Sequence, residues 1–365
     1  MDEVLLIRAA QRCRLMLLAC TVLFLTVPCL SATPTKSKAK TIPAPPELLL
    51  EGGRKLSFES SFSAERDVRK PGFWGKVLDV VAGEPEMHWM VRPYSIAVDS
   101  HGRAIVTDPG AEGVHIFDQE HHKYKFIERK ENESNPMLEP QCVAVDERDT
   151  IYVTDSKSGK IFVFSPEGKF ERAIGSLRGG EGYFKRPTGI AVDLKAERIY
   201  VSDTVRHKVF ALDMKGNVLA VWGENGSGPL QFNYPTELRI AGDELLVVDA
   251  MNFRVQRLGF DGKFKGSFGR SADRVEEFFR PKAIAVDSEG HYYIPNGMSN
   301  NVQVFDQEGQ LLYSFGGPGT GLGNFQLPSG IFISKSDRVY VVDSYNRRVQ
   351  VFHYYALQPV RGERP

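Results

Sequence analysis

Short runs of apolar residues alternate with polar turns along most of this chain, and the pattern repeats. In residues 325–352 (FQLPSGIFISKSDRVYVVDSYNRRVQVF), a proline opens one apolar run, a polar turn leads to a second run that ends in aspartate, and a polar loop leads to a third. The same order occurs six times and always opens at a proline, at steps of 47, 47, 48, 46 and 47 residues: Pro93, Pro140, Pro187, Pro235, Pro281 and Pro328. A fixed period of this length indicates a repeat architecture.

The second repeat, residues 138–175, shows what each repeat contains. Its runs VAVD, IYVTD, KIFVF and FERAIG are rich in the β-branched and aromatic residues that favour strands. Segments rich in Asp, Ser, Gly and Pro separate these runs, and such turns join neighbouring strands into antiparallel hairpins. We therefore predict that each repeat is a four-stranded antiparallel meander.

Neighbouring positions within the strands are both apolar, as in Ile151-Tyr152-Val153. A sheet with one face in water would alternate more regularly, whereas a sheet covered on both faces would not. A blade wedged between two other blades is covered in this way. The sequence therefore predicts an all-β protein, a six-bladed β-propeller of four-stranded antiparallel blades.

The repeats also resemble a known family. The pattern P-x-G-I-A-V-D followed by I-Y-V-x-D-x-x-N-x-R-V-Q-V-F, best kept at 232–258 and 325–352, is similar to the NHL repeat. The resemblance covers residues 91–352 and implies the same six-bladed fold. It implies no single activity, because propellers serve enzymes, receptors and scaffolds alike.

The last repeat ends at Phe352 after only three strands, and an earlier segment has the sequence of the missing one. Residues 74–83 (WGKVLDVVAG) match the fourth-strand position seen in 217–223 (NVLAVWG). We predict that residues 76–82 form the outer strand of the last blade, so that an N-terminal strand closes the ring and removes exposed edges. The propeller would then span 73–356, between a largely irregular or disordered linker at 33–72 and a C-terminal tail at 357–365.

Residues 1–32 have the features of an export leader. Arg8, Arg12 and Arg14 precede the apolar stretch Leu15–Leu30, and Ser31-Ala32 closes it. A basic segment, an apolar segment and a small-residue end are typical of a secretory signal peptide. Lipidation at Cys20 and retention as an uncleaved anchor are the alternatives. We expect an exported protein, periplasmic or extracellular, that contacts a membrane only through its N-terminus.

The charge balance argues against a nucleic-acid partner, and the cysteine content argues against a disulfide. The chain has 46 basic and 46 acidic residues, a balance that does not favour nucleic acid. Some NHL propellers bind RNA on a basic channel face, but here that face also carries aspartates and the chain has an export leader. Outside the leader Cys142 stands alone, so the mature chain has no intrachain disulfide, and we predict that this cysteine is a small buried residue. We expect a monomer without a cofactor.

Topology predicts which residues meet a ligand. In a meander, the loop that leads into the first strand and the loop between the second and third strands lie at the same end, around the mouth of the central channel. Ligands bind at such mouths. The candidates are the residues at these positions that differ from blade to blade: Tyr94, Gln141, Thr188, Thr236, Glu237, Lys282, Asn296 and Ser329.

The second strands end in aspartate in five repeats: Asp108, Asp155, Asp203, Asp249 and Asp343. A carboxylate at the end of a strand accepts hydrogen bonds from the amides of the turn that follows. Because these residues repeat, and a catalytic residue is usually needed once, we interpret them as structural.

Two enzyme families with a similar frame offer an alternative. Amidating lyases of the NHL group hold zinc with histidines on the channel face, but here only His207 falls in such a loop, and catalytic zinc takes about three protein ligands. In a gluconolactonase-like site, Glu237 and Asn296 could hold a hard cation. We assign no catalytic or metal-binding residue. We expect a module that binds a protein, peptide or glycan at the channel mouth, with a metal-assisted hydrolase or lyase, gluconolactonase-like or amidating-lyase-like, as the alternative.

Overall fold

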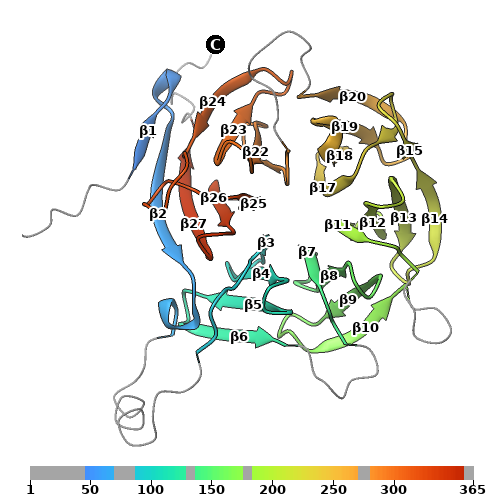
Figure 1. Cartoon of the computed structure of the whole chain (residues 1–365), viewed down its shortest axis with the longest axis horizontal. Helices are drawn as coiled ribbons and strands as arrows, with labels where there is room; N and C mark the ends of the chain where they lie inside the picture. Colours follow the sequence, from blue (N-terminus) through green and yellow to red (C-terminus); the bar gives the residue numbers. More distant parts are fainter. Residues whose placement is uncertain (1–45, 70–86, 129–135, 176–182, 270–279, 357–365) are drawn as a thin grey trace, which may run out of the picture. The chain divides into compact units, whose positions relative to one another are not determined.

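Four-stranded antiparallel sheets follow one another along the chain and stand around a common centre in the computed structural model (Figure 1). The structure describes residues 46–69, 87–128, 136–175, 183–269 and 280–356, all within one compact unit, Pro45–Pro365. Six sheets form the blades of a propeller, which confirms the all-β, six-bladed fold predicted from the repeats.

Each blade is a meander whose first strand lies nearest the centre (Figure 1). The strands of blades one to three are β3 (Ser95–Val98), β4 (Ala104–Asp108), β5 (Gly113–Asp118), β6 (Lys123–Ile127); β7 (Pro140–Val145), β8 (Ile151–Asp155), β9 (Lys160–Phe164), β10 (Phe170–Ile174); and β11 (Pro187–Asp193), β12 (Arg198–Asp203), β13 (Lys208–Asp213), β14 (Val218–Trp222).

Blades four and five follow the same order, and blade six takes its inner three strands from the end of the chain. Their strands are β17 (Pro235–Ala241), β18 (Glu244–Asp249), β19 (Arg254–Gly259), β20 (Phe264–Phe268); β21 (Ala285–Val286), β22 (Tyr292–Asn296), β23 (Asn301–Phe305), β24 (Leu311–Phe315); and β25 (Pro328–Ile333), β26 (Arg338–Asp343), β27 (Arg348–Tyr355).

A few short elements lie outside the inner blade strands. A two-stranded parallel pair, β15 (Glu224–Asn225) with β16 (Gln231–Phe232), follows blade three. One-turn 3₁₀ helices occur at Glu51–Gly53, Glu65–Asp67 and Ala250–Asn252. In the described part of the chain, no helix has the length and apolar character needed to cross a membrane.

The hydrophobic core is divided among the interfaces between neighbouring blades. In β8, Ile151 and Val153 pack against blade one, whereas Tyr152 between them packs against blade three. All three side chains are buried. The runs of consecutive apolar residues in the sequence thus reflect sheets that are covered on both faces.

An N-terminal strand closes the ring, as predicted, but it is not the predicted one. The outer position of blade six belongs to β2 (Lys55–Phe62), which pairs antiparallel with β27 from Lys55 opposite Tyr355 to Phe62 opposite Val349. Strand β1 (Glu47–Leu49) adds a fifth strand outside it. Leu56 and Phe62 are both buried by this pairing.

The assignment of residues 76–82 to this position is therefore wrong, because β2 already occupies the hydrogen-bonding edge of β27. Residues 76–82 lie outside the described residues. Strands β1 and β2 also fall within 33–72, the segment predicted to be a linker, so strand structure begins earlier than the predicted boundary at residue 73. The leader at 1–32 and the tail at 357–365 lie outside the described residues, and their assignments stay predictions.

Candidate functional site

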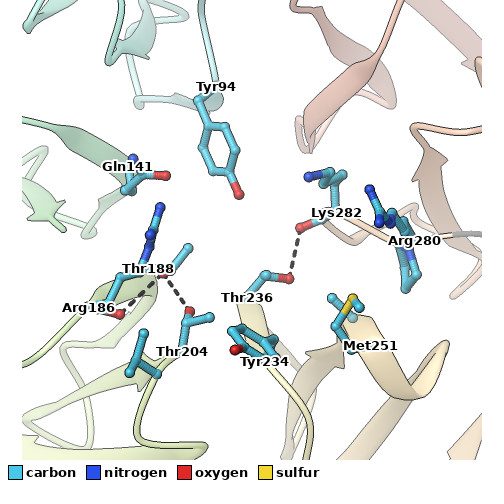
Figure 2. Close-up of a pocket in the computed structure, with 13 residues that line it drawn as sticks. Tyr94, Gln141, Arg186, Thr188, Thr204, Tyr234, Thr236, Met251, Arg280 and Lys282 are labelled. Carbon is cyan, nitrogen blue, oxygen red and sulfur yellow. Dashed lines mark hydrogen bonds between the residues drawn. The ribbon is translucent and has the colours of Figure 1, made fainter.

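A pocket of about 310 Å³ lies at the mouth of the central channel (Figure 2). Its walls come from blades one to five, from the loops that lead into first strands and the loops that join second and third strands. The lining residues are Tyr94, Gln141, Arg186, Thr188, Thr204, Val205, Tyr234, Thr236, Ala250, Met251, Arg280, Pro281 and Lys282.

Hydroxyl groups fix the backbone around this mouth. The side chains of Thr107, Thr154 and Ser202, each next to last in its second strand, donate to the carbonyl of the residue after the opening proline of the next blade. Those acceptors are Gln141, Thr188 and Thr236. The second strand of one blade thereby holds the first strand of its neighbour, and this sets the positions from which the mouth side chains project.

Threonines also link blades three, four and five at the pocket wall. Thr188 and Thr204 share a hydrogen bond of 2.6 Å between their hydroxyls, and Thr204 donates to the carbonyl of Pro235 at 2.7 Å. Thr236 donates to the carbonyl of Lys282 at 3.3 Å, as Figure 2 shows. These hydroxyls are used within the scaffold, so the pocket's free polar groups are elsewhere.

Three basic side chains line the pocket: Arg186, Arg280 and Lys282. Arg186 and Arg280 are exposed and Lys282 is half-buried. Among the residues that the structure describes, no carboxylate lines the pocket. Burial, and after it the neighbouring charge of Arg280, lowers the pKa of Lys282. The positive charge of the Lys282 amine therefore has no neighbouring carboxylate among the described residues.

Cys142, Glu237 and Arg239 contact one another in the interior of the ring. Cys142 Sγ donates to Glu237 Oε2 at 3.0 Å, and Arg239 Nη2 lies 3.7 Å from Glu237 Oε1. Arg239 also donates to the carbonyls of Ile284 and Ile331 in blades five and six, at 3.1 and 3.2 Å. These contacts join blades two, four, five and six across the centre.

Burial shifts the pKa values of the ionisable groups in the channel. It raises the pKa of Glu237, and it raises the pKa of Cys142 together with the negative charge of Glu237. Burial likewise raises the pKa of Tyr94 well above its usual value. Tyr94 therefore presents a neutral phenol that can donate a hydrogen bond. The prediction that Cys142 is a small buried residue is confirmed.

Glu237 has room that other blades lack. Gly189 occupies the equivalent position in blade three, where an added Cβ would lie 2.1 Å from the carbonyl oxygen of Thr236. At Gly330 in blade six an added Cβ would lie 2.7 Å from the carbonyl oxygen of Tyr94. The first strands press closely together at those blades, whereas blade four can place a carboxylate inside the channel.

The eight residues predicted for the mouth divide into two groups. Tyr94, Gln141, Thr188, Thr236 and Lys282 line the pocket together, whereas Glu237 is buried against Cys142 and is not among the lining residues. Asn296 instead bonds Gln303 at 3.3 Å and accepts from the amides of its own loop. Ser329 is buried and donates to the carbonyl of Tyr94 at 2.8 Å. The latter two serve the scaffold.

Sequence reasoning missed Arg186, Arg280 and Tyr234. Each directly precedes an opening proline, a position that is as regular in the repeat as the residue after it. The residue before the proline was therefore a usable signal. The predicted set instead takes the residues that follow the proline and Asn296 at the end of a second strand.

The structural interpretation of the strand-end aspartates is confirmed. Asp108 accepts the amides of Val91 and Arg92 at 2.6 and 2.9 Å, and Asp343 accepts the amide of Gln326 and the guanidinium of Arg348, both at 2.7 Å. These carboxylates are fully buried. They hold the loops around the mouth and leave no oxygen pointing into the pocket.

Residues suited to a metal gather away from the mouth. Among the described His, Cys, Asp and Glu side chains, one group has metal-binding spacing: Asp99, His101 and Asp149, in the turns of the opposite face. His207, near the mouth, accepts from the amide of Tyr234 at 3.2 Å and contacts the Asn225 side chain at 3.1 Å. The predicted pair Glu237 and Asn296 make separate sets of contacts.

The fold is that of a six-bladed β-propeller, and a pocket lies at one end of its central channel. A protein family described as 6-bladed beta-propeller (DUF5128) matches residues 97–220 and 280–364, more than half of the chain. The chain belongs to this family.

Known proteins resemble the chain in sequence or in structure. The chain is 26% identical over 117 residues to Protein brain tumor of Drosophila melanogaster, a match that covers 31% of this chain and 11% of that protein. It resembles a gluconolactonase of Xanthomonas campestris, with a TM-score of 0.57, 13% identity, and 86% and 95% of the two chains covered. It also resembles virginiamycin B lyase from Staphylococcus aureus, with a TM-score of 0.54, 13% identity, and 82% and 99% covered.

Proposed function

We propose that the chain is an exported binding module that engages a protein or peptide partner through the face around the channel mouth. The observation that carries the proposal is the pocket, because five blades each contribute side chains to it and its unpaired groups face solvent. A site assembled from non-equivalent side chains on a rigid ring suits recognition. Export rests on the leader pattern at 1–32.

Exposed apolar side chains next to the pocket support this proposal. Two positions after the end of the second strand, blades three to six carry Val205, Met251, Met298 and Tyr345, which are 45%, 40%, 61% and 64% exposed. We call these four residues the apolar rim. Exposed large apolar residues gathered on one face are typical of interaction sites. Because the rim lies beside the pocket, one partner can cover both.

The comparisons support a binding role only in general terms. The match to Protein brain tumor covers about a tenth of that protein, and the likeness to the gluconolactonase and the lyase shows the fold alone. Function on a shared fold depends on the site. The site here offers unpaired basic and apolar groups, so we favour binding over metal-assisted hydrolysis or elimination.

A cross-linking experiment tests the proposal. The full chain is expressed in its native host, cross-linked, and its partners in the exported fraction are identified by mass spectrometry. The rim variant Met298→Asp with Tyr345→Asp should lose the partner without a change in thermal unfolding. The matched control, Leu219→Asp with Leu312→Asp, alters side chains that are 50% and 46% exposed on outer strands, and it should keep the partner.

Two results would contradict the proposal. One is a partner lost in the outer-strand control and kept in the rim variant. The other is turnover of lactone or ester substrates with divalent metal that Glu237→Gln abolishes, which would support the enzymatic alternative.

A further inference from the structure

Several arginines on the mouth face form ion pairs, and the basic side chains of the pocket do not form them with any described residue. Arg206, Arg254 and Arg348 lie 3.6, 2.9 and 2.7 Å from the carboxylate of the aspartate that ends their own second strand. In contrast, no carboxylate of the described residues pairs with Arg186, Arg280 or Lys282. Three arginines of the mouth face are thus neutralised by a carboxylate, whereas the three cations of the pocket have no such partner among the described residues.

Hydrogen-bond donors accompany these charges. The Tyr94 hydroxyl points into the cavity and the Gln141 side chain borders it (Figure 2). Neither side chain has a hydrogen-bond partner among the described residues. Arg186 and Lys282 come from blades three and five, so the two cations approach the cavity from different sides of the ring. An anion at this place would meet charge and donors together, in a site where partial burial strengthens both interactions.

Part of the wall is apolar and exposed. Val205, Tyr234 and Met251 line the pocket on the side of blades three and four. The volume of about 310 Å³ lies at the lower end of the range for small-ligand sites, enough for a carboxylate and one neighbouring side chain. A highly hydroxylated acidic sugar would leave these apolar groups without a matching surface.

We propose that this pocket binds a carboxylate carried by a peptide, with Lys282 and Arg186 holding the carboxylate and Val205, Tyr234 and Met251 contacting the adjacent apolar side chain. Arg280 adds to the positive field at the opening, and the Tyr94 hydroxyl donates to the anion. The inference rests on the proposed function, because it names the chemistry of the partner segment that enters the mouth.

Equilibrium dialysis of the full chain against labelled hexapeptide pools tests it. The first pool contains Asp, Glu, Leu, Val, Phe, Gly and Ser with an amidated C-terminus. The second replaces Asp and Glu by Asn and Gln, and the third has this neutral composition with a free C-terminal carboxylate. We expect at least tenfold greater retention of the first or third pool than of the second, and the preferred one identifies the source of the carboxylate.

Charge variants locate the binding. Lys282→Met combined with Arg186→Gln should reduce retention of the charged pool to that of the neutral pool. The control Lys157→Met removes an exposed lysine from the blade-two loop on the same face, outside the pocket, and should leave retention unchanged. Variants and parent are compared only where their thermal unfolding curves coincide. Loss of retention in the Lys157 variant equal to that in the pocket variant would overturn the inference, because a general surface charge would then explain binding.

The remaining outcomes separate this inference from the proposed function. Equal retention of all pools, abolished by the rim variant, would overturn the carboxylate and keep the binding face. Retention of labelled oligogalacturonate without retention of any peptide pool would replace the peptide by an acidic glycan. Failure to retain any pool overturns the inference, and if the cross-linked partner is also indifferent to the rim variant, the proposed function fails with it.

Discussion

The two openings of the central channel use charged residues in opposite ways. At the mouth, Arg186, Arg280 and Lys282 line the pocket, and no carboxylate in the described part of the chain pairs with them. At the other end, a cavity of about 520 Å³ is lined by turns of blades one, two and six and includes Asp99, Asp146 and Asp149. Those carboxylates are already bonded within the protein.

The bonds at the opposite opening hold turns and neighbouring blades. Asp146 accepts the amides of Arg148 and Thr150, both at 2.9 Å. Asp149 of blade two accepts both the amide and the hydroxyl of Ser100 in blade one, at 2.8 and 2.6 Å.

The same inter-blade clamp recurs between blades five and six. There Asp337 accepts the amide and the hydroxyl of Ser288 at 2.9 and 2.6 Å. A contact that recurs at equivalent positions serves the ring, whereas the side chains that break the repeat and lack a partner among the described residues are those that we propose for recognition. The acidic opening is therefore scaffold, although Asp99 and Asp149 have the spacing of metal ligands.

The largest effect is expected where the ring closes, because closure supports both openings. Phe62 in β2 is 2% exposed, and its ring lies 4.8 Å from that of Phe117 in blade one. Phe62→Ala should lower the free energy of unfolding by about 3–5 kcal/mol, measured by urea denaturation. Leu49→Ala in β1, where the side chain is 78% exposed, should change it by less than about 0.5 kcal/mol. Equal effects would mean that β2 does not close the ring.

The second effect tests whether the acidic opening is scaffold. Asp149→Ala and Asp337→Ala each leave a serine hydroxyl and an amide without an acceptor, so each should lower the free energy of unfolding by about 1–3 kcal/mol. Peptide retention at the mouth should not change. An Asp149 variant of unaltered stability that loses binding of a divalent cation would show instead that this opening is a metal site.

The smallest effect concerns the pH dependence of stability. Burial raises the pKa of Glu237, so the folded chain holds a proton that the unfolded chain releases, and stability falls as pH rises above the ordinary glutamate value of about 4.3. Glu237→Gln should remove this fall, so that its stability relative to the parent rises with pH. Urea midpoints measured between pH 4 and pH 7 give the comparison.

Asp108 provides a control of opposite sign. Burial opposes its ionisation, but the side chain of His115 and the amides of Val91 and Arg92 hold the pKa of Asp108 below its usual value. Its contribution to stability is present at neutral pH and is lost as pH falls through the folded pKa. Asp108→Asn should therefore lose stability relative to the parent as pH rises. The same trend in both variants would contradict the conclusion that burial raises the pKa of Glu237.

The six sheets and the position of the mouth could be predicted because their signals are local. Strand-forming runs, turns and opening prolines recur at a fixed phase, so the residue after each proline falls at the same place in every blade. Ring closure could not be located in this way. Strand β2 is separated from β27 by almost the whole propeller, and its pairing leaves no local repeat signature in KLSFESSF.

The groups that surround the basic side chains of the pocket were likewise decided by the tertiary structure. In the sequence, Arg254 lies five positions after the strand-end Asp249, a spacing at which the two can pair, whereas the neighbours of Arg186 do not indicate its surroundings. Folding brings Arg254 to within 2.9 Å of Asp249, whereas Arg186 projects into the pocket beside groups from four other blades. The pairing of Arg254 is set within one blade, whereas the groups around Arg186 come from blades distant in the sequence that only the closed ring brings together.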